Sequence, residues 1–371
     1  MGLFCTNPSE TKGNPPSIFT TSLAMQPLNL IQTTSTSRSL FNSLRSSNRL
    51  TSRATTFAQN LRHLATSRTT PAEGSRPLRQ EPDSAQFTVS RSEIEHFNKL
   101  ASTWWNEHGA FGLLHRMNPV RVQFIKERLL YDVSRIAESG SGEAESRSQG
   151  PASYDFLANK QVLDVGCGGG IFSEVLARLG AQVLGIDAAE DSIKAARLHA
   201  QSDPQLNPLS NPNPKLLYRH CSVESLLQSD NLHHHGRYDI VCAMEVIEHV
   251  ENPAGFLTAL AELTKPGGHI ILSTISRTPL SKFLTITVAE SNLPIVGIVP
   301  PGTHTYNKFI KPEELTEFFR GQLGWATSYE RSDLETRGCT YDPLAARWKL
   351  FPRDAFWGQW CNYFFGVKKP L

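Results

Sequence analysis

The stretch that decides the fold is Val162-Leu163-Asp164-Val165-Gly166-Cys167-Gly168-Gly169-Gly170. A short apolar run that contains an acid leads into a glycine turn, and an amphipathic segment follows. This order is typical of a buried parallel strand that delivers its carboxyl end to a ligand, because a glycine turn places no side chains in the way. The next acid, Asp187, closes a second apolar run and lies 21 residues after Gly166, where nucleotide-binding folds hold ribose hydroxyls.

The motif leaves three interpretations open. A dinucleotide site needs G-x-G-x-x-G, but Ile171 occupies the position of the third glycine, and Asp164 adds negative charge where a pyrophosphate would lie. S-adenosylmethionine suits that charge better, because it carries a sulfonium and an ammonium group. The third interpretation is a glycine turn that binds nothing. Of the three, the motif favours S-adenosylmethionine.

The N-terminus differs in composition from the rest of the 371 residues. Between Thr11 and Ala72 there is no Asp or Glu, whereas Arg, Ser and Thr are frequent. This composition is typical of a mitochondrial transit peptide, and the alternative is a disordered tail. We therefore predict two parts, residues 1–91 as a transit peptide with a disordered segment and residues 92–371 as the folded domain.

Charge and cysteine content argue against several classes of protein. The formal charge is +2 for the whole chain and −4 without residues 1–91. A slightly acidic body lacks the basic footprint that nucleic acid requires, so no nucleic-acid partner is expected. No run of eighteen apolar residues occurs, so no segment is expected to span a bilayer. The six cysteines form no C-x-x-C pair, which indicates reduced thiols rather than disulfides or a zinc site.

Short apolar runs alternate with amphipathic segments from residue 161 onward, which predicts a parallel sheet with helices on both faces. The predicted strands are 161–165, 182–186, 216–221, 238–244 and 269–274, and the predicted helices are 171–179, 189–200 and 253–263. Two later apolar runs, 325–329 and 361–367, could complete the sheet as an edge hairpin. Residues 265–268 are expected to form a tight turn.

Two helices are predicted before the sheet. Ser92 and Glu95 form a capping-box pattern at the start of the first, and the second is predicted over 119–136. Segments 138–153 and 201–215 are expected to be irregular, because Gly and Ser or Pro are frequent in them.

Several polar or glycine-rich segments follow the carboxyl ends of the predicted strands. They are Gly166, Asp187, 222–224 and 244–249. Ligands of open parallel sheets bind at this edge, so we expect these segments to converge on one crevice.

Together these residues resemble the class I S-adenosylmethionine-dependent methyltransferases. A narrower resemblance, over about residues 92–367, is to the ubiquinone-biosynthesis O-methyltransferases, and the N-terminus is similar to that of their mitochondrial branch. The matching segments are 94–105, 114–121, 163–170, 245–250, 302–304, 308–312 and 341–344. The inserts at 138–153 and 201–215 and the tryptophan-rich tail depart from the family pattern, away from the matching motifs.

The resemblance implies an α/β fold with a seven-stranded, mostly parallel sheet, an antiparallel last strand and an N-terminal helical extension. It implies methylation, by S-adenosylmethionine, of ring hydroxyls in polyprenyl-dihydroxybenzoate and demethylubiquinol, which are polyprenylated catechols. The expected location is the matrix face of the mitochondrial inner membrane. The resemblance also suggests a multi-subunit ubiquinone-synthesis complex as a partner.

Five residues are predicted to bind the cofactor. Asp187 would accept hydrogen bonds from the ribose hydroxyls, although it could be a simple strand-end acid. Gly166 and Gly168 would let the backbone approach the methionine part. The resemblance places Arg121 on the cofactor's carboxylate and Met244 beside the cofactor. Without it, these two would be taken for a solvated helix charge and a core methionine.

Glu245, Glu248 and His249 share one face if their segment is helical. Two carboxylates and an imidazole could hold a divalent ion, with magnesium favoured, and the alternative is acids at a helix N-terminus beside a partly buried histidine. A phenol has a pKa of about 10, and a metal chelated by catechol oxygens would favour its ionised form. No general base is assigned, because a metal-bound His249 could not also serve as one.

Two other segments have two interpretations each. His233–His235 could be a metal cluster, but consecutive loop residues cannot all face one ion, so a solvated turn is favoured. The apolar segment 280–301 could be a packed lid over the active site or an interfacial element that dips into the bilayer. The resemblance favours membrane contact, because a polyprenylated substrate stays in the membrane.

Two alternative functions remain open. One is a catalytically silent methyltransferase-fold subunit that scaffolds other proteins, and the other is a methyltransferase that acts on protein or RNA. The retained Gly166, Asp187 and 245–249 set argues against the first. The acidic body and the apolar 280–301 segment argue against the second.

Overall fold

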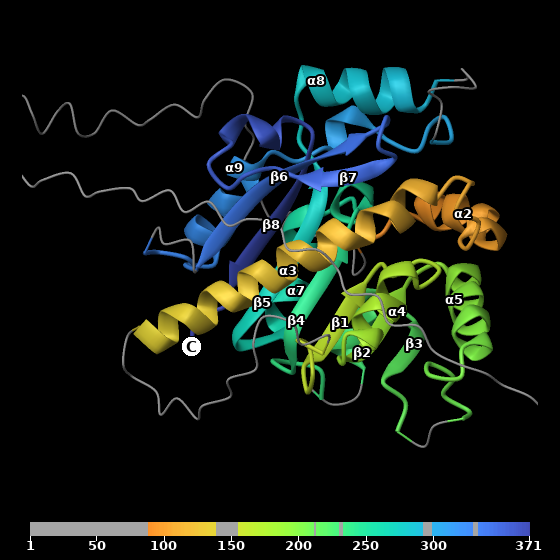
Figure 1. The fold of residues 1–371 in the computed structure, drawn as a ribbon, viewed down its shortest axis with the longest axis horizontal. Coiled ribbons are helices and arrows are strands. Elements are labelled where there is room, and N and C mark those ends of the chain that lie inside the picture. The colour runs from red at the N-terminus through yellow and green to blue at the C-terminus, as the bar shows by residue number, and fades with distance from the viewer. Residues whose placement is uncertain (1–87, 139–154, 211–212, 230–232, 292–298, 329–332) are drawn as a thin grey trace, which may run out of the picture. The chain divides into compact units, whose positions relative to one another are not determined.

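An eight-stranded sheet with the order β3-β2-β1-β4-β5-β8-β6-β7 forms the centre of the fold (Figure 1). The strands are β1 (Gln161–Val165), β2 (Gln182–Asp187), β3 (Leu216–His220), β4 (Tyr238–Met244), β5 (Thr264–Ile275), β6 (Leu334–Asp342), β7 (Arg347–Leu350) and β8 (Asn362–Lys368). β1 to β5 are parallel to one another, and β8, β6 and β7 add antiparallel pairs. The expected class I methyltransferase fold is confirmed. It has one strand more than expected, because β7 pairs with β6.

The structure is a computed structural model that describes residues 88–138, 155–210, 213–229, 233–291, 299–328 and 333–371. All of these residues belong to one compact unit, Thr70–Leu371. Structured contacts begin at Thr88, before the predicted domain start at residue 92. Val89 forms an antiparallel bridge with Val250, and the Thr88 hydroxyl donates to Glu224 at 2.5 Å. The irregular segment predicted at 138–153 lies almost entirely outside the described residues.

The five predicted parallel strands are confirmed, and β1 and β4 have the predicted bounds. Side chains of β1 alternate between two cores, with Val162 in one and Leu163 in the other. This explains why the strands read as continuous apolar runs, since both faces are covered. β5 begins at Thr264, five residues earlier than predicted. The expected turn at 265–268 lies inside this strand, where the pairing of β5 with β4 is irregular.

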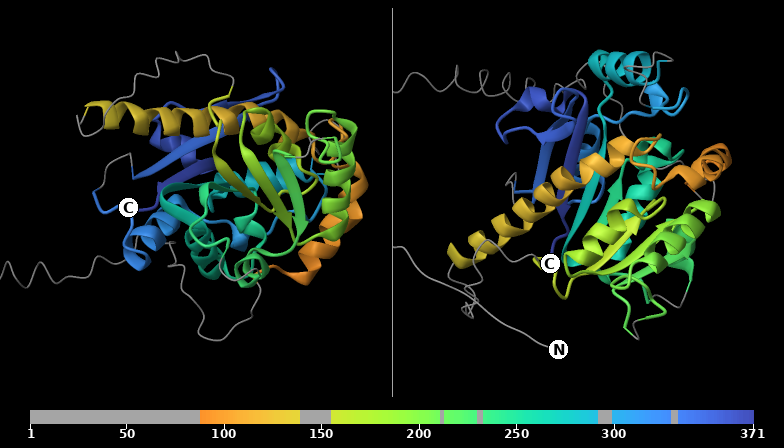
Figure 2. Two further views of the ribbon diagram at one scale, coloured as in Figure 1. Left: turned by 90° about the horizontal axis from the view of Figure 1, so that it is seen from below. Right: turned by 45° about the vertical axis from the view of Figure 1, so that its right-hand side comes forward.

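Helices cover both faces of the sheet (Figure 2). α3 (Gly112–Glu138) and α4 (Ile171–Arg178) pack on one face through Met117, Phe124 and Leu176. The opposite face carries α6 (Val223–Gln228), α7 (Pro253–Leu263), α9 (Pro312–Glu317) and η5 (Phe318–Gln322). α5 (Glu190–Ser202) flanks β3, and α4, α5 and α7 confirm the three predicted helices.

The two N-terminal helices are present, but their predicted starts are wrong. The first, α2 (Arg91–Leu100), has Ser90 at its N-cap, and Ser92 lies inside it. The predicted capping box is therefore absent from this described helix. α3 begins at Gly112 and includes Pro119, because buried residues before and after the proline hold the helix on the sheet.

The predicted edge hairpin is only partly correct. The run at 361–367 forms β8, but β8 lies between β5 and β6 rather than at an edge. Trp325 and Ala326 are outside the strands and are buried in the core. β8 pairs antiparallel with both β5 and β6, and the sequence of β6 is polar. Glu335 and Arg337 of this strand are nevertheless buried, since Arg337 pairs with Glu127 and Glu335 lies 3.9 Å from Arg128.

Shorter elements complete the described part of the chain. They are η1 (Ala101–Thr103), η2 (Ile247–His249), α8 (Pro279–Ser281), η3 (Lys282–Ala289), η4 (Tyr306–Lys308) and η6 (Phe356–Trp360). No helix in the described ranges is long and apolar enough to cross a membrane. The predicted turn at 233–235 is present, but His234 is buried rather than solvated and its Nδ1 lies 2.7 Å from the Tyr238 hydroxyl.

A buried imidazole on β5 predicts acid sensitivity. Burial lowers the pKa of His269 to about 3, and the charges of Arg128, Lys368 and Lys160 act in the same direction. In the unfolded chain His269 binds a proton at a higher pH than it does in the folded protein. Stability therefore falls as the pH drops from 6.5 towards about 3.

We expect His269→Gln to reduce this dependence, because glutamine does not titrate. Urea unfolding at about pH 7.5 and about pH 5 measures this difference. On going to the lower pH, the free energy of unfolding should decrease less for the variant than for the wild type, by up to ~1.4 kcal/mol per pH unit. A stability difference that is the same at both pH values would contradict this explanation.

Candidate active site

A cavity of about 630 Å³ lies at the carboxyl ends of β1, β2 and β4. This volume is typical of small-molecule sites. The predicted convergence of the strand ends is confirmed, since Gly166, Asp187, Ser222 and Met244 all line the cavity. α2, the start of α3, η3 and the segment 299–304 close its other sides. Of the eight predicted site residues, Glu248 alone lies outside this lining.

The backbone conformation of the glycine turn is unfavourable for residues other than glycine. Gly166 and Gly168 have φ values of +67° and +53°, in the left-handed region. A Cβ on Gly168 would also lie 2.4 Å from the Trp104 ring. Asp187 accepts the N–H of Gly168 at 2.8 Å and that of Ala189 at 2.7 Å. The strand-end carboxylate therefore fixes the conformation of the turn through two backbone hydrogen bonds.

Two tryptophans that sequence reasoning did not assign to the site cover this turn. Trp104 stacks on Phe111 with ring centroids 3.6 Å apart, and its indole N–H donates to Ser192 at 3.0 Å. The indole N–H of Trp105 donates to the Gly169 carbonyl at 2.9 Å. The sequence signal was the helical spacing of Ile94, Phe97, Leu100 and Trp104, which indicated a buried face but not its partner.

Arg121 is 3% exposed, so it is not a solvated helix charge. Its guanidinium donates to Asn118 at 3.1 Å, and its Nε has no hydrogen-bond partner within the described ranges. Burial lowers the pKa of Arg121, while the negative charges of Glu245 and Asp164 act in the opposite direction. A buried cation with free donor capacity suits a carboxylate ligand.

Asp164 places a buried carboxyl group in the same cavity. It accepts from the Ser173 hydroxyl at 2.6 Å, and burial raises its pKa to about 6. Together with Arg121 it presents one cation and one acid to a ligand. Such a pair complements a zwitterion, which is the character of the methionine part of S-adenosylmethionine.

Glu245 is the first residue after β4 and has a φ of +57°. This conformation costs a non-glycine residue about 1–3 kcal/mol, and residues that adopt it cluster at functional sites. The strained backbone directs the side chain into the cavity, where Oε1 is buried without a hydrogen-bond partner in the described structure. Strain and an unsatisfied buried oxygen both indicate a functional role.

The predicted metal ligands are not assembled into a site. Only 247–249 form a short helix, η2, and Glu245 precedes it in a left-handed conformation, so the premise of a shared helical face is wrong. Glu248 accepts from Thr274 at 2.8 Å. Burial and the neighbouring Glu245 raise the pKa of Glu248 to about 7. No group of three or more His, Cys, Asp or Glu side chains that could hold a metal occurs among the described residues.

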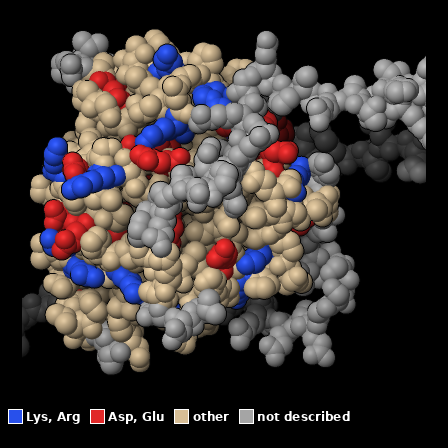
Figure 3. Space-filling model, turned by 180° about the vertical axis from the view of Figure 1, so that it is seen from behind, with Lys and Arg blue, Asp and Glu red and all other residues tan. Residues whose placement is uncertain are grey.

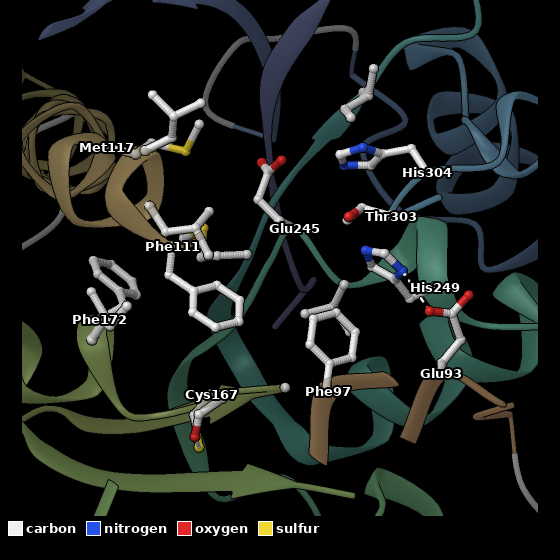
Figure 4. A pocket seen from close by; sticks show the side chains of 18 of the residues that line it. Glu93, Phe97, Phe111, Met117, Cys167, Phe172, Glu245, His249, Thr303 and His304 are labelled. Atoms are coloured by element: carbon white, nitrogen blue, oxygen red, sulfur yellow. Dashed lines mark hydrogen bonds and ion pairs between the residues drawn. The ribbon is translucent and has the colours of Figure 1, made fainter. Parts of the chain in front are cut away.

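His249 lines the cavity and lies 3.1 Å from Glu93 (Figure 4). The same carboxylate accepts from Lys308 at 3.2 Å. Burial would raise the pKa of Glu93, but its hydrogen bonds and ion pairs with His249 and Lys308 lower it to about 2. Burial disfavours the charged form of His249, but hydrogen bonding to Glu93 raises its pKa overall. Glu93 was not predicted, since nothing in the sequence links α2 to η2.

His304 is another lining residue for which the sequence predicted no role. Its Nδ1 lies 2.7 Å from Oε1 of Glu290, a buried carboxylate that also accepts the N–H groups of Gly302 and His304. Burial lowers the pKa of His304. Figure 4 shows Glu245, His249 and His304 gathered on one side of the cavity. The only sequence signal was that 302–304 belongs to a matching family segment.

The apolar segment after β5 covers the cavity, as the lid interpretation predicted. Leu284, Thr285, Val288 and Ala289 line the cavity from η3, and residues 292–298 lie outside the described residues. The outer side of the same segment exposes Leu280 and Phe283. The lid therefore has apolar surface on both sides.

The fold and the cavity define a class I S-adenosylmethionine-dependent methyltransferase, and residues 136–326 match a family of methyltransferase domains. Magnesium protoporphyrin IX methyltransferase from Synechocystis, solved with bound S-adenosylmethionine, is 16% identical, with a TM-score of 0.39, over 78% of this chain and 100% of that one.

Two curated relatives are much more similar. The mitochondrial ubiquinone biosynthesis O-methyltransferase of Schizosaccharomyces pombe is 41% identical over 76% of this chain and 88% of its own length. The ubiquinone biosynthesis O-methyltransferase of Psychrobacter cryohalolentis is 41% identical over 77% of this chain and 96% of its own length. The chain belongs to the ubiquinone biosynthesis O-methyltransferase family.

We expect Gly168→Ala to destabilise the protein by about 2–4 kcal/mol, since a left-handed backbone and overpacking against Trp104 both contribute. Gly236→Ala is the matched control, because Gly236 has a φ of +58° and no atom of the described residues lies within 4 Å of the added methyl group. It should cost about 1–2 kcal/mol. Equal losses in urea unfolding would show that Trp104 does not constrain the turn.

Proposed function

We propose that this chain methylates a ring hydroxyl of a polyprenylated catechol, with S-adenosylmethionine as the methyl donor. The substrates would be polyprenyl-dihydroxybenzoate and demethylubiquinol. The observation that supports this most strongly is the cavity itself, in which buried Arg121 and Asp164 face a glycine turn held by Asp187. The names of the curated relatives support the same pathway.

Each part of the cofactor has a candidate partner in the cavity. Asp187 would accept from the ribose hydroxyls, because its oxygens each retain a lone pair beyond their backbone bonds. Arg121 would bind the carboxylate, and Gly166 and Gly168 would allow close backbone approach, with Met244 alongside. Bound in this way, the cofactor supplies an electrophilic methyl group. The lid formed by η3 would exclude water from the reacting oxygen.

Incubation of the protein with labelled S-adenosylmethionine and a short-tailed catechol should give labelled methyl ether. Asp187→Asn should weaken cofactor binding by about 10–100-fold in calorimetry, because hydrogen bonds to a charged group are lost. Asp191→Asn, an exposed acid four residues away, should leave it unchanged. A wild-type protein that neither binds the donor nor modifies catechols would overturn the proposal.

We also propose that Glu245, Glu248 and His249 hold magnesium when the substrate is bound. The chemistry of the donors fits a hard cation, since Oε1 of Glu245 and Oε1 of Glu248 are buried without a partner in the described structure. When bound, such an ion would act as a Lewis acid on the catechol oxygens. The three side chains would have to draw together, because they form no metal group as they stand.

Glu245→Ala and chelation test the metal separately from the donor. Both should reduce turnover by at least about 100-fold while cofactor affinity stays within about 3-fold of the wild type, because Glu245 is proposed to hold the metal and not the cofactor. Magnesium added back after EDTA should restore the wild type but not the variant. Full activity in EDTA would remove the metal from the mechanism.

We propose a mitochondrial location, at the matrix face of the inner membrane. The stretch from Thr11 to Ala72 without Asp or Glu and the mitochondrial relative in Schizosaccharomyces pombe support it. A multi-subunit ubiquinone-synthesis complex is a proposed partner, whereas nucleic acid is not. On the face in Figure 3, basic and acidic side chains are interspersed rather than gathered into a basic patch.

Peripheral membrane contact is proposed through segment 280–301. Of its described residues, Leu280, Phe283 and Leu284 are 45%, 55% and 40% exposed. The sequence from 276 to 311 has four basic residues and a single acid, Glu290, which is buried. Arg277 and Lys308 pair with Glu314 and Glu93, which leaves Lys282 as an exposed cation beside the apolar residues. An apolar surface with an adjacent lysine suits an anionic bilayer, and it lies at the lid of the cavity.

Leu280→Glu combined with Phe283→Glu should reduce flotation with anionic liposomes by at least about 10-fold, because two apolar anchors are replaced by charges that the bilayer repels. Leu209→Glu is the matched control, since Leu209 is 84% exposed between α5 and β3. Activity on a soluble short-tailed catechol should survive in both variants. Unchanged flotation of the double variant would refute membrane contact through this segment.

A further inference from the structure

His304 is held in one tautomer by the carboxylate behind it. Glu290 accepts the backbone N–H of Gly302 at 2.7 Å and that of His304 at 2.9 Å, so its oxygens act as acceptors. The 2.7 Å contact between Glu290 Oε1 and Nδ1 of His304 therefore requires a proton on Nδ1. In the neutral ring this leaves Nε2 unprotonated, as a hydrogen-bond acceptor.

The position of the ring presents it to a bound substrate. His304 lines the cavity, and Phe309 packs against the ring edge-on at 6.0 Å between centroids. The charged and titratable groups that face it are Glu290, Glu245 and His249, whose ring centroid lies 6.1 Å away. In the described part of the chain its side-chain hydrogen bond is to Glu290, so Nε2 remains available to a ligand.

The other polar groups on this side of the cavity are already engaged or have a different proposed role. His249 shares Glu93 with Lys308, and Glu245 is a proposed ligand of magnesium. Glu93 orients His249 in a similar way, but His249 and Glu245 are both proposed to hold magnesium, so neither is assigned the proton. A buried carboxylate that orients an imidazole from behind is the arrangement that general bases use.

We propose that His304 is the general base of the methyl transfer, with Glu290 as its positioning residue. This inference rests on the proposed O-methylation. The proton of the reacting catechol hydroxyl passes to Nε2, while a lone pair of that oxygen forms the bond to the methyl carbon. The carbon–sulfur bond breaks, and its electron pair stays on sulfur. The positive charge of the sulfonium is thus replaced by that of the imidazolium, which later releases its proton to solvent.

Glu290 also connects this base to the lid. It is the C-cap residue that follows η3, and its carboxylate accepts the backbone N–H groups of Gly302 and His304. The lid and the base are therefore one hydrogen-bonded unit. A substrate that moved the lid would move Nε2 with it.

Substrate acidity separates a base from a structural residue. On a catechol with an ordinary phenolic hydroxyl, His304→Gln should lower kcat by about 100-fold or more, with KM and cofactor affinity within about 3-fold of the wild type. On an electron-poor catechol that is already ionised at the assay pH, the same variant should lose less than about 5-fold, because no proton needs to be removed. His108→Gln, at an exposed histidine, is the matched control.

Glu290→Gln tests the positioning role, because an amide can either accept from or donate to the ring and so permits both tautomers. We expect about a 10-fold lower kcat with little change in KM. The ¹⁵N chemical shifts of the imidazole should show the Nδ1–H tautomer in the wild type and a mixture in the variant. This measurement needs no turnover and keeps the test decisive if His304→Gln fails to fold.

Three results would overturn the inference while leaving the proposed function intact. They are a His304→Gln enzyme with nearly normal kcat on the ordinary catechol, an equal loss on both catechols, or an Nε2–H tautomer in the wild type. Failure of the wild type to methylate any catechol would instead overturn the proposed function.

Discussion

The carboxylate of Asp187 is the constraint on which the site depends. By accepting the N–H groups of Gly168 and Ala189, it joins the turn after β1 to the residues that lead into α5. The turn is thereby held in a left-handed conformation, and Trp104 packs directly against it. A cofactor would therefore meet a preorganised backbone and would not have to order it on binding.

The same cavity holds charges that the fold alone would not need. Arg121, Asp164 and Glu245 are drawn from α3, β1 and the end of β4, and burial works against the charged forms of the first two. Isolated buried charges are costly, and the backbone of Glu245 is strained as well. The carboxylate and ammonium groups of S-adenosylmethionine would compensate Arg121 and Asp164, and a bound cation would compensate Glu245. Ligand binding would therefore offset an electrostatic cost that the fold carries at this site.

The two sides of the lid meet different surroundings. Its inner side must cover a polar reaction, whereas its outer side exposes Leu280 and Phe283. Glu290 lies between the two sides, and its buried carboxylate is hydrogen-bonded to the backbone of Gly302 and His304 and to the His304 ring. The Glu290 side chain thereby links the apolar lid, η3, to His304, the polar group that would face the substrate.

Local patterns in the sequence determined the parallel strands, the glycine turn and Asp187, because a strand buried on both faces has to be apolar throughout and its turn has to be glycine. They did not reveal β6, whose buried polar residues are satisfied by Glu127 and Arg128 from α3. Nor did they show that Glu248 turns away from the cavity or that Glu290 supports His304. These features depend on pairings between distant segments. Only the tertiary structure decides which carboxylate meets which partner, since burial and charge pairing arise only when those segments pack together.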